Sequence, residues 1–143
     1  MDWLWVILVA IRGASPAPDD QWATRLAELD RVRAEAFATG DTSLLRDVYT
    51  ADSRGLRADR RVIAAYARRD GRVQGAQLRV LSCRVERQDG DRVVLDVVDQ
   101  LAPARVAWGD GSSTRLPTDR PTRRTVTLRR THAGWRIDAS GQG

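Results

Sequence analysis

Apolar residues recur at helical spacing between residues 20 and 39 of the chain. They fall at every third or fourth position, at Trp22, Leu26, Leu29, Val32 and Ala36, with Phe37 beside the last. This period places them along one face of an amphipathic helix. Asp19 or Asp20 is placed to cap its start, and Gly40 is placed to end it in a left-handed turn. The pattern predicts a long first helix whose apolar face enters a core.

Two shorter helical patterns follow this first helix. Asp41 or Thr42 caps the earlier one, whose buried side consists of Leu44, Leu45, Val48 and Tyr49. A third helix is predicted from about Leu56 to Arg69, and its inward residues are Val62, Ile63, Tyr66 and Ala67. Asp70 and Gly71 then stop it, so the amino-terminal half of the chain is predicted to be helical.

The pattern changes from helical to alternating after residue 76. Residues 77–87 and 92–101 read as two strands joined by a tight turn, and Pro103 interrupts the second before it resumes toward Trp108. Residues 125–131 and 135–139 form a last hairpin about Ala133 and Gly134. The expected fold class is α+β, with three helices packed in the concave face of a curved, four-stranded antiparallel sheet. The stretch from Gly109 to Pro121 exceeds the usual connection of about 4 to 6 residues and is predicted to be the most mobile internal loop.

The amino terminus differs in composition from this folded part. Residues 3–11 form an unbroken apolar run, too short for the span of about 20 residues that a bilayer requires. A linker rich in Pro, Ala and Ser follows at residues 12–19. The run is either an anchor remnant or signal-like segment, or an arm packed on its own domain or a partner. The linker favours an anchor, and we expect the reading frame to continue upstream of Met1 with further apolar residues.

These patterns divide the chain into four parts. Residues 1–11 are the anchor, 12–19 the linker, 20–140 one domain and 141–143 a disordered tail. An anchor at the amino terminus places the domain at the cell membrane on the extracytoplasmic side, and a cytoplasmic location is the alternative. At 143 residues the chain is long enough for one domain with its own core and too short for two.

All basic residues of the chain are arginines, because it contains no Lys. The absence of Lys excludes Schiff-base chemistry and the lysine of a phosphate-binding loop. The formal charge of +5 favours anionic partners, but the arginines are spread from Arg12 to Arg136. This spread favours a solvated surface, so we expect a membrane contact through the apolar run and no nucleic-acid partner.

Few side chains suited to catalysis or metal binding are present. Cys83 is the single cysteine, which excludes an internal disulfide, and we expect it in the core. His132 is the single histidine and is expected at the surface. Asp96 and Asp99 lie three apart on one strand and therefore face opposite sides of the sheet, where a structural pairing with an arginine of the neighbouring strand is expected. We assign no catalytic, cofactor-binding or metal-binding residue, and no cofactor.

Three motifs carry a resemblance to a known superfamily. Ala-Thr-Gly-Asp-Thr-Ser-Leu-Leu at 38–45, Tyr-Thr-Ala-Asp at 49–52 and Gly-Trp-Arg-Ile at 134–137 resemble the nuclear transport factor 2-like superfamily, over about residues 20 to 140. This resemblance implies a cone-shaped, cystatin-like fold of the polyketide cyclase and ketosteroid isomerase type. The isomerases use an Asp base with a Tyr and a protonated Asp. Their positions fall near Arg33, Arg57 and Val126 here, so the resemblance is to a catalytically silent, extracytoplasmic member.

The resemblance also implies a cavity at the wide end of the cone. Its candidate lining residues are Phe37, Tyr49, Tyr66, Asp99, Trp108 and Trp135. The function predicted first is a non-catalytic interaction or accessory domain tethered to the membrane, with a protein partner or self-association. The alternative is a carrier of a small hydrophobic ligand, or an isomerase- or dehydratase-like enzyme that uses the cavity. A third possibility is a cytoplasmic adaptor that dimerises through its sheet.

Overall fold

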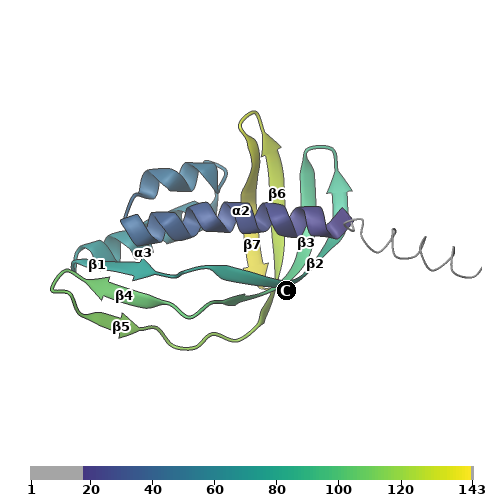
Figure 1. The fold of residues 1–143 in the computed structure, drawn as a ribbon. Helices are drawn as coiled ribbons and strands as arrows, with labels where there is room; N and C mark the ends of the chain where they lie inside the picture. Colours follow the sequence, from purple (N-terminus) through teal and green to yellow (C-terminus); the bar gives the residue numbers. More distant parts are fainter. Residues whose placement is uncertain (1–17, 143) are drawn as a thin grey trace, which may run out of the picture.

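The computed structural model describes residues 18–142. The apolar run at 1–11 and residues 12–17 of the linker lie outside this range. The order of elements is α2 (Pro18–Thr39), η1 (Thr42–Asp47), α3 (Arg54–Ala67), β1 (Gly71–Gln74), β2 (Leu78–Asp89), β3 (Arg92–Leu101), β4 (Arg105–Trp108), β5 (Ser113–Arg115), β6 (Thr122–Thr131) and β7 (Gly134–Gln142). Three helices thus precede antiparallel strands, which confirms the predicted α+β class (Figure 1).

The first helix, α2, is longer than its sequence pattern predicts. It begins at Pro18, a residue favoured in the first helical turn, so Asp19 and Asp20 lie inside the helix rather than before it. Gly40 ends it as expected, with a φ of 76° and its amide bonded to the carbonyl of Ala36 at 2.9 Å. The buried residues of its apolar face are Leu26, Leu29, Ala34, Ala36 and Phe37.

The second helical segment, η1, is a 3-10 helix. Asp41 caps it by accepting a hydrogen bond from the amide of Ser43. Leu45, near its end, and Val48, which follows it, are fully buried. Two turns of 3-10 helix therefore suffice to place these two side chains in the core.

The inward face of α3 differs from the prediction. Ser53 caps the helix, which ends at Ala67. Ile63 is buried, but Val62 is 42% exposed and Ala67 is exposed, so neither of these two residues lies in the core. The third inward position belongs to Asp59, which is buried beside Leu56 and Ile63. The prediction was based on apolar residues alone, so it missed the charged Asp59 on the buried face and placed Val62 and Ala67 there instead.

The strands form two antiparallel sheets. The larger has the order β2-β3-β6-β7, which is the predicted four-stranded sheet. The smaller has the order β1-β4-β5, and the sequence analysis predicted neither β1 nor β5. β5 lies inside the stretch predicted as a loop, where Arg115 pairs with Arg105 of β4. This pairing corrects the loop assignment for residues 113–115.

The two sheets meet at a bend, where the chain passes from β1 to β2 and, beside it, from β3 to β4. β3 ends at Leu101 and the chain resumes as β4, as the break at Pro103 predicts. Beside it, Gly75 separates β1 from β2 with a φ of 77°, and a Cβ there would lie 3.1 Å from the carbonyl oxygen of Pro103. The bend turns β1, β4 and β5 away from the larger sheet (Figure 1).

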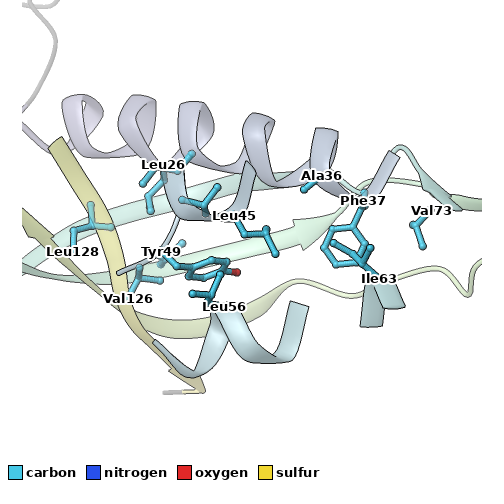
Figure 2. Close-up of a cluster of buried hydrophobic side chains, with 14 of the residues drawn as sticks. Leu26, Ala36, Phe37, Leu45, Tyr49, Leu56, Ile63, Val73, Val126 and Leu128 are labelled. Carbon is cyan, nitrogen blue, oxygen red and sulfur yellow. The ribbon is translucent and has the colours of Figure 1, made fainter. Parts of the chain in front are cut away.

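The core lies between α2 and the inner face of the larger sheet. Leu45, Val93, Leu95 and Leu128 are fully buried there, and burying each such side chain stabilises the fold by about 1.5 to 3 kcal/mol (Figure 2).

Cys83 is half-buried and packs against this core. His132 is exposed, as expected. β7 includes residues 141 and 142, which corrects their assignment to a tail.

No helix within residues 18–142 combines the length and the apolar character that a bilayer crossing requires.

Candidate functional site

A cavity of about 110 Å³ lies between α2 and the inner face of the larger sheet. Its apolar lining comes from both layers, and its polar lining consists of ionisable side chains. The lining residues are Leu26, Asp30, Arg33, Tyr49, Leu78, Val80, Val97, Asp99, Arg124, Val126, Ile137 and Ser140. We refer to Asp30, Arg33, Tyr49, Asp59, Asp99 and Arg124 as the cavity-side cluster.

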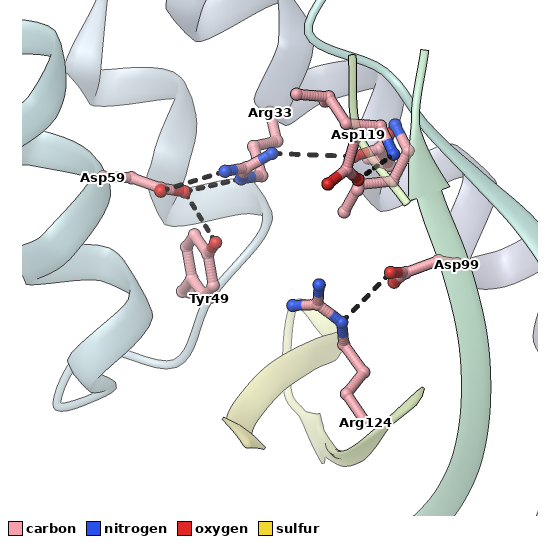
Figure 3. Close-up of polar contacts among 9 residues, drawn as sticks. Arg33, Tyr49, Asp59, Asp99, Asp119 and Arg124 are labelled. Atoms are coloured by element: carbon pink, nitrogen blue, oxygen red, sulfur yellow. Dashed lines mark hydrogen bonds and ion pairs between the residues drawn. The ribbon is translucent and has the colours of Figure 1, made fainter. Parts of the chain in front are cut away.

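Asp59 joins three segments of the chain at this cluster. Arg33 of α2 donates to both of its carboxylate oxygens, from Nε at 2.7 Å and from Nη2 at 3.1 Å (Figure 3). The hydroxyl of Tyr49 donates to the same carboxylate at 2.6 Å. The side chains of Arg33 and Asp59 are only 21% and 10% exposed. Two-point bonding in a buried position holds α3 against α2 in one orientation.

Burial and charge act together on the pKa values of this group. Burial by itself lowers the pKa of Arg33, but the Asp59 carboxylate raises it above its ordinary value. Burial raises the pKa of Tyr49, and the neighbouring Asp59 raises it further. Arg33 therefore stays charged and Tyr49 stays protonated across the physiological range.

Tyr49 needs a close approach by the start of α3. A Cβ on Gly55 would lie 2.6 Å from Cε1 of the Tyr49 ring, well inside a normal contact. Glycine at this position lets the ring lie beside the helix and direct its hydroxyl to Asp59.

Asp30 is the unusual member of the cavity-side cluster. Its Oδ2 accepts a hydrogen bond from the amide of Leu78 at 2.8 Å, which ties α2 to the start of β2. Its Oδ1 is buried without a hydrogen-bond partner and lies 3.9 Å from Nη1 of Arg33. Burial is the main cause that raises the pKa of Asp30 from 3.8 to about 6.

Asp99 enters the cavity from β3. Nε of Arg124, on the neighbouring β6, donates to its Oδ1 at 3.1 Å (Figure 3). Burial raises the pKa of Asp99, and the charge of Arg124 counters part of that effect. The sequence predicted this pairing of Asp99 with an arginine of the neighbouring strand.

An open groove of about 630 Å³ lies at the mouth of the cavity. It lies between the start of α3 and β7, and it shares Arg33, Tyr49 and Arg124 with the cavity. Its other polar lining includes Asp52, Arg54 and Asp138. Four members of the cavity-side cluster, Arg33, Tyr49, Asp59 and Arg124, are therefore reachable from solvent through this groove.

A second polar group lies on the outer face of the same sheet. Arg123 bonds both oxygens of Asp96 at 2.8 Å, and Arg84 bonds one of them at 3.3 Å. We refer to these three residues as the outer-face triad. The side chains of Arg84 and Arg123 are 73% and 62% exposed. The hydrogen bond from Arg123 is the main cause that lowers the pKa of Asp96.

The residues predicted to line a cavity lie in different places. Tyr49 and Asp99 line the cavity described above, while Phe37 and Tyr66 line a separate hollow between α2, α3 and β1. The ring of Trp108 packs on Tyr66 at 6.3 Å, beneath the guanidinium group of Arg69. The ring of Trp135 contacts that of Trp22 at 4.9 Å. The structure brings two of the six candidates together at the cavity.

The sequence analysis did not list Asp30, Arg33, Asp59 or Arg124 as lining residues. A signal was present for two of them, because Asp30 and Arg33 fall between Leu26 and Phe37 at spacings of three and four, on the inner face of α2. Of the positions compared with the isomerases, Arg33 and Val126 line the cavity and Arg57 is exposed. In the part of the chain that the structure covers, no group of three His, Cys, Asp or Glu side chains is arranged to hold a metal ion.

Solved structures of other proteins have a fold similar to this one. No protein-family model matches the chain, and no curated protein is similar to it in sequence. The intermembrane space region of the chloroplast protein ARC6 is similar in structure, with a TM-score of 0.64 and 16% identity over 89% of this chain and 98% of that one. The protein Aln2 from a Streptomyces species has a TM-score of 0.53 and 15% identity, over 87% and 90% of the two chains.

A candidate dehydratase of the NTF2-like family from Streptomyces avermitilis is also similar, with a TM-score of 0.50 and 15% identity over 85% and 94% of the two chains. At such identities the likeness is one of fold. The chain has the nuclear transport factor 2-like fold that its three motifs predict.

Proposed function

We propose that this domain is a non-catalytic interaction or accessory module, tethered at the extracytoplasmic face of a membrane by its amino-terminal segment. The observation that carries the proposal is the pairing of the aspartates that line the cavity and its adjoining groove. Asp59 is held by Arg33 and Tyr49, and Asp99 is held by Arg124, at distances between 2.6 and 3.1 Å. Each of these two carboxylates already has an arginine partner, which supports a structural role for both.

The size of the cavity supports the same proposal. Pockets for drug-sized ligands enclose about 300 to 1,000 Å³. The enclosed volume here, about 110 Å³, is enough for about four water molecules at about 30 Å³ each. A drug-sized ligand would therefore not fit within the cavity alone and would have to extend into the adjoining groove.

The proposed location is supported by composition and by one structural likeness. The apolar run at 3–11 and the linker, shortened to 12–17 because α2 begins at Pro18, are typical of an anchor and a tether. The ARC6 region, whose fold is similar, lies in an intermembrane space. α2 begins at Pro18, so a tether would join the domain at the start of this helix.

The test is a topology experiment on the protein expressed from its own locus. A reporter active only outside the cytoplasm, fused after Gly143, should be active and should fractionate with membranes. A matched fusion that lacks residues 1–17 should be inactive. Recovery of the intact protein in the cytosolic fraction, with an inactive reporter, would overturn the tethered location and favour the cytoplasmic adaptor.

Asp30 favours a second candidate function, a ligand carrier or acid-base enzyme that uses the cavity. Its Oδ1 is buried without a hydrogen-bond partner, and its pKa of about 6 is suited to proton transfer near neutral pH. Asp30 lines the cavity, which shares Arg33, Tyr49 and Arg124 with the groove of about 630 Å³.

A screen of small hydrophobic ligands by calorimetry separates the two functions. Saturable binding to the full chain that is lost in Asp30→Asn, while the outer-face variant Asp96→Asn still binds, would establish the second function. The interaction module predicts no saturable binding to any of the three proteins.

A further inference from the structure

The exposed face of α3 carries one sign of charge. Arg54, Arg57 and Arg61 of α3 are exposed, as is Arg68, which caps the carboxyl end of the helix, and we refer to these four residues as the α3 arginine face. On a helix their positions lie within a narrow arc, since they are separated by three, four and seven residues. The one acidic residue of the helix, Asp59, is buried and already paired with Arg33. The outer charge of α3 is therefore not balanced within the helix.

The rest of the domain does not neutralise this face either. Within residues 18–142, none of these four guanidinium groups forms an ion pair, and Arg57 donates only to the backbone carbonyl of Asp52 at 3.1 Å. Other exposed arginines in this range, such as Arg79 and Arg92, also form no ion pair there, so what distinguishes the α3 arginine face is that its four unpaired charges lie along one side of a helix. Like charges one turn apart weaken a helix, so the fold retains an unfavourable arrangement here.

A comparison with α2 argues against an ordinary solvated surface. The exposed residues of α2 alternate in sign, with Arg25, Glu28, Arg31 and Glu35 spaced by three or four residues. This is the balanced pattern of a helix that faces only water. The two helices come from the same arginine-rich composition, so composition alone does not explain the uniform charge on α3.

We propose that the α3 arginine face is the docking surface for an acidic segment of a protein partner. The inference rests on the proposed function and names the chemistry of the partner. Each guanidinium group offers a planar pair of donors that matches a carboxylate. The charge of the face is complementary to a segment rich in Asp and Glu, and binding would relieve the repulsion among the four arginines.

The position of the face argues against a lipid surface. Asp59 of α3 bonds to Arg33, which lies about 22 Å along α2 from Pro18, where a tether would join the domain. α3 therefore lies toward the other end of α2 from a membrane anchor (Figure 1). On the exposed side of α3, Val62 is the one large apolar side chain, at 42% exposed, and a single such residue is a weak anchor in lipid.

The make-up of the face also argues against nucleic acid. Sites for single strands combine basic groups with aromatic rings on which bases stack. The aromatic residue of α3, Tyr66, is half-buried and packs on Trp108. Carboxylates therefore fit the exposed groups better than stacked bases do.

The test compares two variants with equal charge. The first changes Arg54, Arg57, Arg61 and Arg68 to Gln. The matched control changes four other exposed arginines to Gln, at Arg79, Arg92, Arg105 and Arg115. Binding of a dye-labelled peptide of alternating Glu and Ser to the full chain is measured by fluorescence anisotropy at physiological salt.

We expect the α3 variant to bind the peptide about tenfold more weakly or worse, and the control to lose at most about twofold. All eight side chains are exposed, so both variants should melt close to the wild type. The single variant Arg61→Glu, which reverses one charge, should also weaken binding. It tests whether the loss in the fourfold variant comes from the charge of the face rather than from the number of substitutions.

Equal losses in the two variants would overturn the proposal, because they would show a response to total charge alone. The proposal is also overturned if the peptide does not bind. Vesicles of phosphatidylcholine and phosphatidylglycerol and a single-stranded oligonucleotide are tested in parallel, and binding of either through the same arginines without binding of the peptide would assign the face to lipid or to nucleic acid instead. An active reporter in the topology experiment with equal losses here would leave the tethered module intact and move its docking surface elsewhere. An inactive reporter would overturn the tether whatever the peptide does.

Discussion

Asp96 and Asp99 lie three residues apart on β3, and both bond to adjacent arginines of β6. Asp96 points to the outer face, where Arg84 and Arg123 are largely exposed, and its pKa is lowered. Asp99 points into the cavity, where burial outweighs the charge of Arg124 and raises its pKa. The same pairing of residue types therefore gives opposite shifts on the two faces of one sheet.

This difference shows that pairing an aspartate with an arginine does not by itself fix the direction of the shift in the aspartate's pKa. On the outer face, the Asp96 side chain is only 10% exposed, but its partners Arg84 and Arg123 lie largely in water, where salt screens their charges, so we expect the outer-face triad to add less to stability. On the cavity side, each charge has lost its water and depends on its partner. Changes on the two sides should therefore differ in size and in the direction of their pH dependence.

Asp59→Ala should have the largest effect. It leaves the buried guanidinium group of Arg33 without its two-point partner and removes the acceptor of Tyr49. Loss of one member of a buried pair costs about 3 to 5 kcal/mol, and we expect about 3 because Asp30 still lies 3.9 Å from Arg33. Urea denaturation measures this loss. The control Asp89→Ala, at an exposed pair, should change stability by less than about 0.5 kcal/mol, and similar losses in both would contradict the comparison.

Asp30→Asn should change how stability depends on pH. The pKa of Asp30 is raised in the folded state from 3.8 to about 6, so the folded protein binds this proton more tightly than the unfolded chain. That contribution is fully present below about pH 4 and is lost as the pH rises through about 6. The wild type should therefore lose up to about 3 kcal/mol relative to Asp30→Asn between about pH 4 and pH 7. Parallel stability curves for the two proteins would show that Asp30 titrates normally.

Tyr49→Phe should have an intermediate effect. It removes one buried hydrogen bond to a charged acceptor and leaves the ring in place, which costs about 1.5 kcal/mol. Tyr66→Phe is the matched control, since Tyr66 is half-buried and its ring packs on Trp108. Thermal unfolding of both variants measures the difference. Equal losses would mean that the hydroxyl of Tyr49 adds nothing through Asp59.

Asp96→Asn should have the smallest effect, and its pH dependence should be opposite to that of Asp30. Because the pKa of Asp96 is lowered, its contribution is present above about pH 4 and is lost as the pH falls through the folded value. The difference from the wild type should also shrink in about 1 M salt. Carboxyl titration by NMR should place Asp96 below and Asp99 above the ordinary value of 3.8. The reverse order would refute the contrast between the two faces.

Much of the fold follows from local signals in the sequence. Gly40 ends α2, Asp41 caps η1 and the break at Pro103 separates β3 from β4, because each depends on the conformation of one or two residues. β1 and β5 escaped prediction because they are short, and β5 has no apolar residue to mark it. Such strands form only where a neighbouring strand already offers its hydrogen bonds.

The sequence by itself determined that Asp96 and Asp99 face opposite sides of a sheet, since side chains alternate along any strand. It also determined that the buried faces of the helices would pack against a four-stranded antiparallel sheet, but not that a second sheet, β1-β4-β5, would extend this surface. Only the tertiary structure decided that Arg33 pairs with Asp59, 26 residues away, and that Asp30 is left with a buried oxygen lacking a hydrogen bond. The physical reason is that burial, which sets the pKa and the strength of each pair, depends on packing between segments that are distant along the chain.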